Sequence, residues 1–121
     1  KGVLLCWRDD DVFGQGWHVP GRIIRYQNSI TKTLEDCLKF ELNIENVSGE
    51  ALEFVKVLEL KNVSLANRKF SLTLTYQYNM SDEDAEKYPV NNEIQWFKKY
   101  PENMLTVHKE KYCQVIEELL A

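Results

Sequence analysis

The clearest pattern in the chain is the strict alternation of apolar and polar residues between Phe70 and Tyr78. It predicts a strand, because successive side chains of a strand point to opposite faces of a sheet. The apolar positions are expected to face the core, and the polar ones could face a pocket. The apolar face carries Phe70, Leu72, Leu74, Tyr76 and Tyr78, and the polar face carries Ser71, Thr73, Thr75 and Gln77.

A helical period replaces this alternation in two other segments. Apolar residues recur at helical spacing between Ile30 and Leu42, after Asn28 and Ser29, and Asn43 suits a left-handed C-terminal cap. A second helix is predicted over Val107–Leu120. Its apolar side is expected to be Tyr112, Val115, Ile116, Leu119 and Leu120.

Shorter apolar runs predict the remaining strands and the turns between them. We expect strands at Val3–Arg8, Trp17–Tyr26, Ala51–Leu60 and Glu93–Tyr100, a turn from Asp9 to Gly16, and an acidic loop from Ser81 to Lys87. Pro20 and Gly21 predict a kink in the second strand, and Pro101 ends the last one. Helices packed on a mixed sheet give an α/β fold, an α/β/α sandwich, in a single domain spanning residues 1–121.

Composition narrows the classes of partner. A net charge of −4, with Lys and Arg scattered along the chain, offers no basic footprint for nucleic acid. No apolar run approaches the roughly 20 residues of a membrane span, so no membrane partner is expected. The odd number of cysteines and their lack of metal-type spacing favour a reduced, cytoplasmic protein. The run Asp9–Asp11 is interpreted as a solvated loop.

Glu41 breaks the pattern of the first helix. At about 100° per residue it falls within the arc of Ile30, Leu34 and Leu42, away from the charged face. A carboxylate in the last turn also opposes the helix dipole, whose C-terminal end is negative. Two explanations remain open from spacing alone: Glu41 binds a cation, or its side chain reaches solvent or a nearby lysine.

The segment from Trp17 to Ile44 resembles a degenerate Nudix box, the loop-helix signature of hydrolases that act on nucleoside diphosphates linked to another group. Trp17-His-Val-Pro-Gly21 resembles the entry of that signature, and Glu41 matches the second of its two consecutive helix glutamates. Several other signature positions differ. Arg22 replaces the second Gly, Asn28 the first Glu, and Phe40 the first of the paired glutamates.

Within that superfamily the chain is most similar to the GDP-mannose mannosyl hydrolases. Leu4-Leu5-Cys6-Trp7-Arg8 is similar to their Leu-Leu-x-Lys-Arg strand, and Gln95-Trp96-Phe97 to their Arg-Trp-Leu. The resemblance implies a Nudix-type α/β/α sandwich with a mixed β-sheet. Family members have one more strand before the position of Lys1, so that strand is missing here, disordered, or supplied by a partner chain, and we expect a homodimer.

The resemblance also implies a site for a nucleotide sugar or another nucleoside diphosphate. Mg²⁺, or Mn²⁺, would be held by Glu41 and the backbone carbonyl of Gly21, and Arg8 would contact the diphosphate. Other family arginines align with Ile23 and Asp36. Arg22 and Arg25 are therefore the candidates to replace them in binding substrate.

The histidine that serves as general base in the family has no counterpart in this chain. The family uses a histidine in the loop that here reads Tyr88-Pro-Val-Asn-Asn-Glu93. Asn91 and Asn92 cannot accept a proton, so they are assigned to substrate binding and Glu93 is the catalytic candidate beside Arg8. His18 and His108 are interpreted as structural. Two functions remain: a divergent hydrolase of a GDP-mannose-like nucleotide sugar, and a catalytically inactive nucleotide-binding or dimerisation module.

Overall fold

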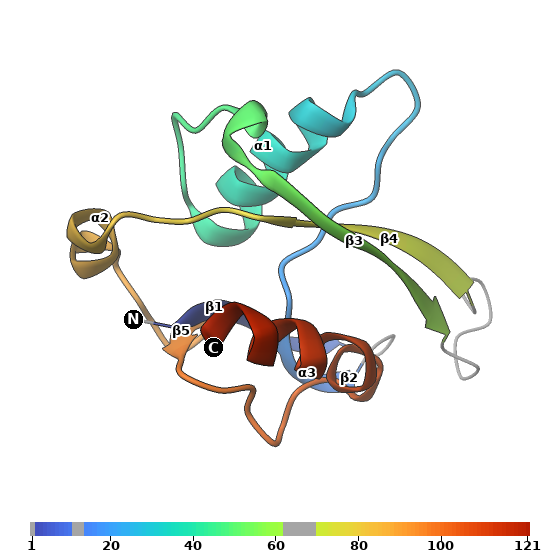
Figure 1. Cartoon of the computed structure of the whole chain (residues 1–121), viewed down its shortest axis with the longest axis vertical. Coiled ribbons are helices and arrows are strands. Elements are labelled where there is room, and N and C mark those ends of the chain that lie inside the picture. The colour runs from blue at the N-terminus through green and yellow to red at the C-terminus, as the bar shows by residue number, and fades with distance from the viewer. Residues whose placement is uncertain (1, 11–13, 62–69) are drawn as a thin grey trace.

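The computed structural model describes residues 2–10, 14–61 and 70–121. In those ranges the chain forms mixed α/β structure with antiparallel sheets and three α-helices (Figure 1). The elements in order are β1 (Val3–Asp10), β2 (Gly14–His18), α1 (Ile30–Leu42), the 3-10 turn η1 (Gly49–Ala51), β3 (Glu53–Lys61), β4 (Phe70–Gln77), α2 (Asp82–Lys87), β5 (Ile94–Phe97) and α3 (Thr106–Leu120).

The first sheet has the strand order β2-β1-β5 and is covered on both faces. One face presents Leu5 and Trp17 to α3, where they join a core with Tyr112, Val115 and Ile116. The opposite face presents Cys6 and Ile94 to α1, against Leu38 and Leu42. Cys6 and Ile94 are cross-strand partners, so they share that face.

The second sheet pairs β3 with β4 in antiparallel register, for example Val57 opposite Leu74. A register shift between Phe54 and Lys56 marks a bulge in β3. Figure 1 shows these two strands crossing the molecule between α1 and α3. Leu58 and Leu60 of β3 pack on the α3 core, so one face of this sheet is covered by the rest of the fold.

The ends of α1 follow from local chemistry. The hydroxyl of Ser29 accepts a hydrogen bond from the backbone N–H of Lys32 at 3.0 Å, which satisfies one of the free donors of the first turn. Asn43 ends the helix in the left-handed conformation, with φ of 56°. Its N–H is hydrogen-bonded to carbonyl oxygens of the last turn. Both boundaries and the Asn43 cap agree with the sequence prediction.

Several predicted elements need correction. Among the described residues the ladders within both sheets are antiparallel, whereas one mixed sheet was predicted. The strand predicted at Trp17–Tyr26 begins earlier and ends at His18, because Pro20 cannot donate to a ladder. Asp9 belongs to β1 and not to a turn, while Asp11 lies outside the described residues. The acidic loop predicted at Ser81–Lys87 is largely helical, capped by the hydroxyl of Ser81.

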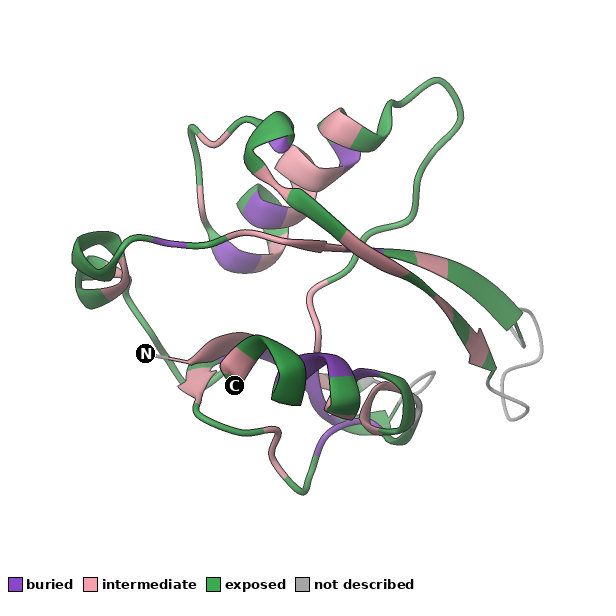
Figure 2. Ribbon diagram, in the orientation of Figure 1, coloured by how far each residue is buried: buried purple, intermediate pink, exposed green. Residues whose placement is uncertain are grey.

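The predicted faces of β4 are also wrong. Phe70 and Leu72, expected in the core, are 53% and 64% exposed, whereas Thr75 of the polar face is buried. Figure 2 shows the first half of β4 as mostly exposed. The reason is the side from which the sheet is covered: α3 packs on the face that carries Leu58 and Leu60, and this is the face of Thr75.

Among the helices that the structure describes, none is long and apolar enough to cross a membrane.

Candidate functional site

The predicted metal ligand Glu41 lies where α1 meets β1. Its backbone carbonyl accepts a hydrogen bond from the thiol of Cys6, with an Sγ–O distance of 3.7 Å. Burial, with a smaller contribution from the negative charge of Glu41, raises the pKa of Cys6 to about 12. Burial and the charge of Glu41 also raise the pKa of Cys37, to about 11. The Glu41 carboxylate therefore lies close to two thiols that stay protonated at neutral pH.

Arg22 brings a positive charge to the same end of α1. Its guanidinium carbon lies 4.8 Å from the centre of the Phe40 ring, within the range of a cation–π contact. Its charge also lowers the pKa of Cys37, opposing burial and Glu41. The segment at Gly21 and Arg22 therefore lies along the C-terminal half of α1, although both residues are exposed. The sequence did not indicate this, because Phe40 offers no pattern that points to a distant arginine.

Arg8 approaches from β1, on the same side of the sheet as Cys6. Two residues along a strand return a side chain to the same face, about 7 Å further on. Since the Cys6 thiol contacts the last turn of α1, Arg8 and Glu41 border the same face of this sheet. Arg8 is half-buried, and its charge contributes to lowering the pKa of His108.

His108, which is half-buried, forms a pair with the buried His18 beside Arg8. Their ring centres are 5.9 Å apart, and Tyr112 lies 5.3 Å beyond His108. Burial lowers the pKa of His108 to about 4, with smaller contributions from His18 and Arg8. Its Nδ1 accepts a hydrogen bond from the backbone N–H of Val19 at 3.0 Å, so the proton of the neutral ring is on Nε2. This supports the structural role expected for His108.

The loop expected to hold the general base is anchored to β1 next to Arg8. The carbonyl of Glu93 accepts from the N–H of Trp7 at 2.7 Å. The side-chain oxygen of Asn91 accepts from the N–H groups of Glu93 at 2.7 Å and Ile94 at 3.0 Å. Asn91 thus closes a turn. This role was not predicted from the sequence, although asparagine is typical of such turns. Asn92 and Glu93 are exposed.

The predicted site residues therefore fall into two groups. Arg8 lies with the Asn91–Glu93 loop, and Glu41 lies with Arg22 near Cys37. Arg25 is exposed in a turn whose carbonyl accepts from the N–H of Asn28, and nothing described connects it to either group. Within residues 2–10, 14–61 and 70–121, no three His, Cys, Asp or Glu side chains gather closely enough to hold a metal ion together.

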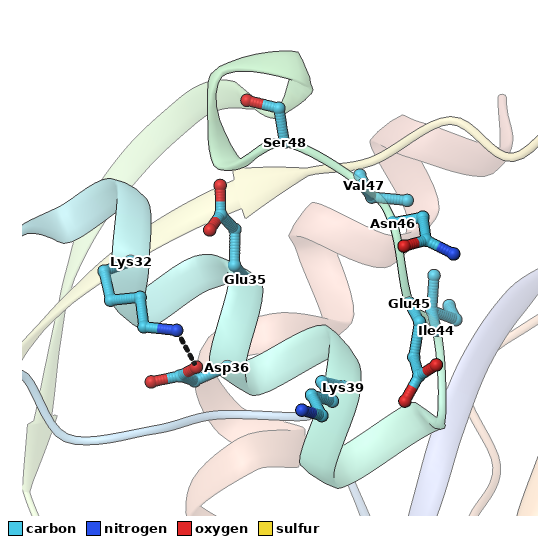
Figure 3. A pocket seen from close by; sticks show the side chains of 9 residues that line it. All are labelled: Lys32, Glu35, Asp36, Lys39, Ile44, Glu45, Asn46, Val47 and Ser48. Carbon is cyan, nitrogen blue, oxygen red and sulfur yellow. Dashed lines mark ion pairs between the residues drawn. The ribbon is translucent and has the colours of Figure 1, made fainter.

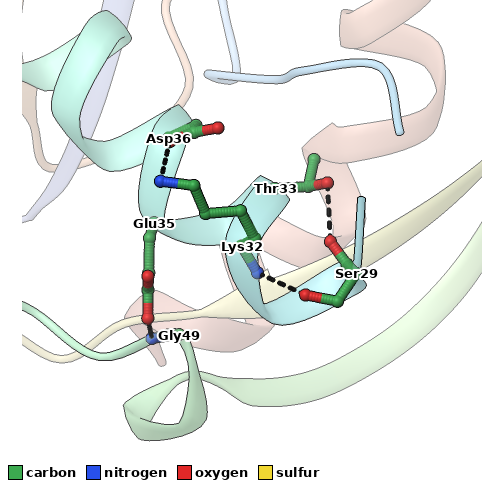
Figure 4. A network of polar contacts seen from close by, with 6 residues as sticks. All are labelled: Ser29, Lys32, Thr33, Glu35, Asp36 and Gly49. Atoms are coloured by element: carbon green, nitrogen blue, oxygen red, sulfur yellow. Dashed lines mark hydrogen bonds and ion pairs between the residues drawn. The ribbon is translucent and has the colours of Figure 1, made fainter. Parts of the chain in front are cut away.

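A shallow hollow of about 400 Å³ lies on the opposite, charged side of α1 (Figure 3). Lys32, Asp36 and Lys39 of α1 border it, together with the segment Ile44–Ser48. Glu35 fixes that segment by accepting the N–H of Gly49 at 2.8 Å (Figure 4). None of the predicted site residues lines this hollow, so we interpret it as the junction between α1 and its following loop.

No protein-family model matches the chain, no curated protein sequence matches it, and no solved structure matches it.

Proposed function

We propose that the chain is a divergent Nudix-type module, with a variant of the α/β/α sandwich, that binds a nucleoside diphosphate sugar or a related nucleoside diphosphate and hydrolyses it slowly. The observation that carries the proposal is the position of Arg8 and Glu41 at one face of the β1 sheet. A diphosphate needs both a cation and a planar guanidinium for neutralisation. These residues are the matches to the two family positions that supply them.

The residues of this site could hold Mg²⁺ only together with oxygen atoms of the substrate. One carboxylate and one carbonyl, from Glu41 and Gly21, make a small set of protein ligands. Mg²⁺ commonly keeps several waters and is held by one or two carboxylates together with substrate phosphates. Glu41 and Gly21 would therefore hold the ion jointly with the diphosphate, and the bound ion would neutralise the leaving group.

Arginines would orient the diphosphate. Arg8 extends from β1, in which Leu5 and Cys6 are buried, so its guanidinium has a fixed origin for paired hydrogen bonds to phosphate oxygens. Arg22, held at Phe40, would approach from the α1 side. Asn92 is exposed in the loop beside Arg8 and would contact the sugar, whereas the Asn91 side chain is already engaged in its turn.

Proton removal from the attacking water would be inefficient. His108 carries its proton on Nε2 and uses Nδ1 for Val19, so it is not a base for this reaction. Glu93 is the carboxylate nearest along the chain to the expected position of the base, and it is exposed. Without a well-placed base the rate would be lower by about 10²- to 10⁴-fold.

The second candidate function is a nucleotide-binding module without turnover. It is favoured by one observation: the Asn91 side chain, in the loop where the family has its base, is hydrogen-bonded within its own turn. Binding of a diphosphate would need Arg8, Arg22 and Glu41, and it would not need Glu93.

The proposal is tested with GDP-mannose and Mg²⁺, measuring nucleotide binding by calorimetry and released nucleotide by chromatography. We expect Mg²⁺-dependent binding that Glu41→Gln weakens at least about 10-fold, equivalent to about 1.4 kcal/mol. Glu45→Gln is the matched control, because Glu45 is exposed just beyond the helix and borders the hollow on its other side. Arg8→Lys should weaken binding about as much as Arg8→Ala, since lysine lacks the planar fork.

Turnover then separates the two functions. Slow release of nucleotide that falls in Glu93→Gln supports the hydrolase, and binding with no release supports the inactive module. Equal Mg²⁺-dependent affinity in the wild type and in Glu41→Gln would exclude the metal site in both versions.

A further inference from the structure

The loop that leads into α1 is exposed along its whole length. Every residue from 21 to 30 is exposed, and Figure 2 shows this loop as a continuous green stretch before the helix. Ile23 and Ile24 are 44% and 47% exposed, and Tyr26 is 91% exposed. The loop therefore carries large apolar side chains that the described part of the chain leaves in contact with solvent.

Two residues of α1 extend this apolar surface. Ile30 is 41% exposed and Phe40 is 59% exposed. They are ten residues apart, about 80° short of three full turns, so they lie on one side of the helix and about 15 Å apart along its axis. Arg22 contacts the Phe40 ring and Ser29 caps the first turn, so the loop starts near one end of this side and finishes at the other. We call the following set the loop patch: Ile23, Ile24, Tyr26, Ile30 and Phe40.

A hydrogen-bonded turn presents Tyr26 at the tip of the loop. The carbonyl of Arg25 accepts a hydrogen bond from the N–H of Asn28 at 3.0 Å, and Gln27 has a φ of 69°. A positive φ is uncommon for a residue other than glycine, and it persists where the surrounding structure fixes it. Tyr26 is therefore held in solvent by a defined turn, directly beside a cationic side chain.

The loop is positively charged, although the whole chain has a net charge of −4. The segment 14–34 contains no Asp or Glu, and its basic residues are Arg22, Arg25 and Lys32. Lys32 is paired with Asp36 at 3.0 Å. Within the described residues, neither arginine forms an ion pair with a carboxylate. The molecule therefore presents a cationic, apolar loop toward any negatively charged surface that it approaches.

We propose that this loop docks on an anionic lipid surface, with the loop patch in the headgroup region and Arg22 and Arg25 on lipid phosphates. Guanidinium groups bind phosphate through paired hydrogen bonds, and tyrosine is enriched at membrane interfaces. Apolar side chains flanked by cations are typical of interfacial anchors. The irregular backbone of the loop keeps it out of the hydrocarbon core, where its polar groups would lose their partners.

This contact differs from a membrane span. The sequence prediction of no membrane partner rested on the absence of a long apolar run, which a contact at the headgroups does not need. The proposal also does not rest on the proposed nucleotide site.

The area of the loop patch favours a lipid surface over a second protein. Its five side chains expose on the order of 500 Å², in a strip along one helix and its preceding loop. A standard protein interface buries about 800 Å² on each partner and requires a complementary shape. A fluid lipid surface adapts to the loop, and it gains from both apolar burial and attraction of the arginines. Two copies meeting at this patch would bring like charges together.

The test is sedimentation of the protein with lipid vesicles, without nucleotide or Mg²⁺. We expect binding to phosphatidylcholine vesicles that contain about one third phosphatidylserine, and at least about 10-fold weaker binding to phosphatidylcholine alone. Raising the salt concentration to about 1 M should also weaken binding, because it screens the arginines. Ile24→Asp should weaken binding at least about 10-fold, since a carboxylate would replace an apolar side chain at an anionic surface.

Leu72→Asp is the matched control. Leu72 is 64% exposed on β4, outside the loop patch, and its replacement makes the same change in net charge. Its binding should stay within about 2-fold of the wild type. Far-ultraviolet circular dichroism would verify that both variants are folded. Tyr26→Trp adds a direct readout, because its emission should move to shorter wavelength on vesicles, relative to the wild type, as the added ring leaves water.

Three outcomes would overturn the proposal. The first is a wild type that does not bind vesicles containing phosphatidylserine, which would favour an acidic protein as the partner. The second is equal binding by the wild type and Ile24→Asp. The third is loss of binding in Leu72→Asp but not in Ile24→Asp, which would place the lipid contact on the β3–β4 sheet.

Discussion

The two sheets of this protein differ in how many of their faces the rest of the chain covers. The β2-β1-β5 sheet lies between α3 and α1, so both Leu5 on one face and Cys6 on the other are buried. The β3–β4 sheet is covered on one face, and Phe70 and Leu72 are exposed on the other. Both regions are rich in apolar residues. Apolar residues in a strand therefore identify surface that needs a partner, but they do not show whether the same chain supplies it.

The largest expected difference between the sheets is in stability. Leu5 is fully buried, so Leu5→Ala should lower the free energy of unfolding by about 3 kcal/mol through lost burial and a cavity. Leu72 is largely exposed, so Leu72→Ala should lower it by no more than about 0.5 kcal/mol. Urea unfolding at low protein concentration measures both. Equal losses would show that Leu72 is covered in solution.

His108, at the edge of the covered sheet, should make the stability of the protein depend on pH. No comparable effect is expected from the β3–β4 sheet. The pKa of His108 is lowered to about 4 in the folded state from an ordinary value of 6.5. The unfolded chain therefore binds a proton first as the pH falls, and stability is lost between about pH 6.5 and about 4, by up to roughly 3 kcal/mol.

His108→Asn tests this pH dependence. The variant cannot titrate, and its side-chain oxygen can still accept from the N–H of Val19. Its free energy of unfolding should therefore change less over that pH range than that of the wild type, as followed by urea unfolding at several pH values. Parallel profiles for the two proteins would contradict a neutral, half-buried imidazole at this position.

The smallest expected effect concerns helix caps. Ser29 caps α1, which covers one face of the first sheet, and Ser81 caps α2, which contains no buried residue. Ser29→Ala should cost about 1 kcal/mol of stability. Ser81→Ala should cost less in global unfolding, because α2 can fray without uncovering a core residue. Thermal unfolding compares the two, and a larger loss for Ser81→Ala would show that α2 supports the core.

The sequence indicated many residues of the candidate site, but it did not indicate how they are arranged in space. Glu41 was singled out by its conflict with the helix pattern, and Arg8 by the resemblance of its strand to one of the GDP-mannose mannosyl hydrolases. The contact of the Cys6 thiol with the Glu41 carbonyl joins residues 35 positions apart, and the contact of Arg22 with Phe40 depends on the path of the loop before α1. No periodic pattern encodes such contacts, because they follow from how the elements pack.

The sequence by itself determined the elements whose causes are local. α1 begins after Ser29 and ends at Asn43 because a side-chain cap and a left-handed residue act within one turn of the helix. β4 follows from its alternation, which is a property of nine consecutive residues. Only the tertiary structure decided which face of β4 is buried. Alternation separates two faces without ranking them, and α3, which comes last in the chain, packs on the face that contains Thr75.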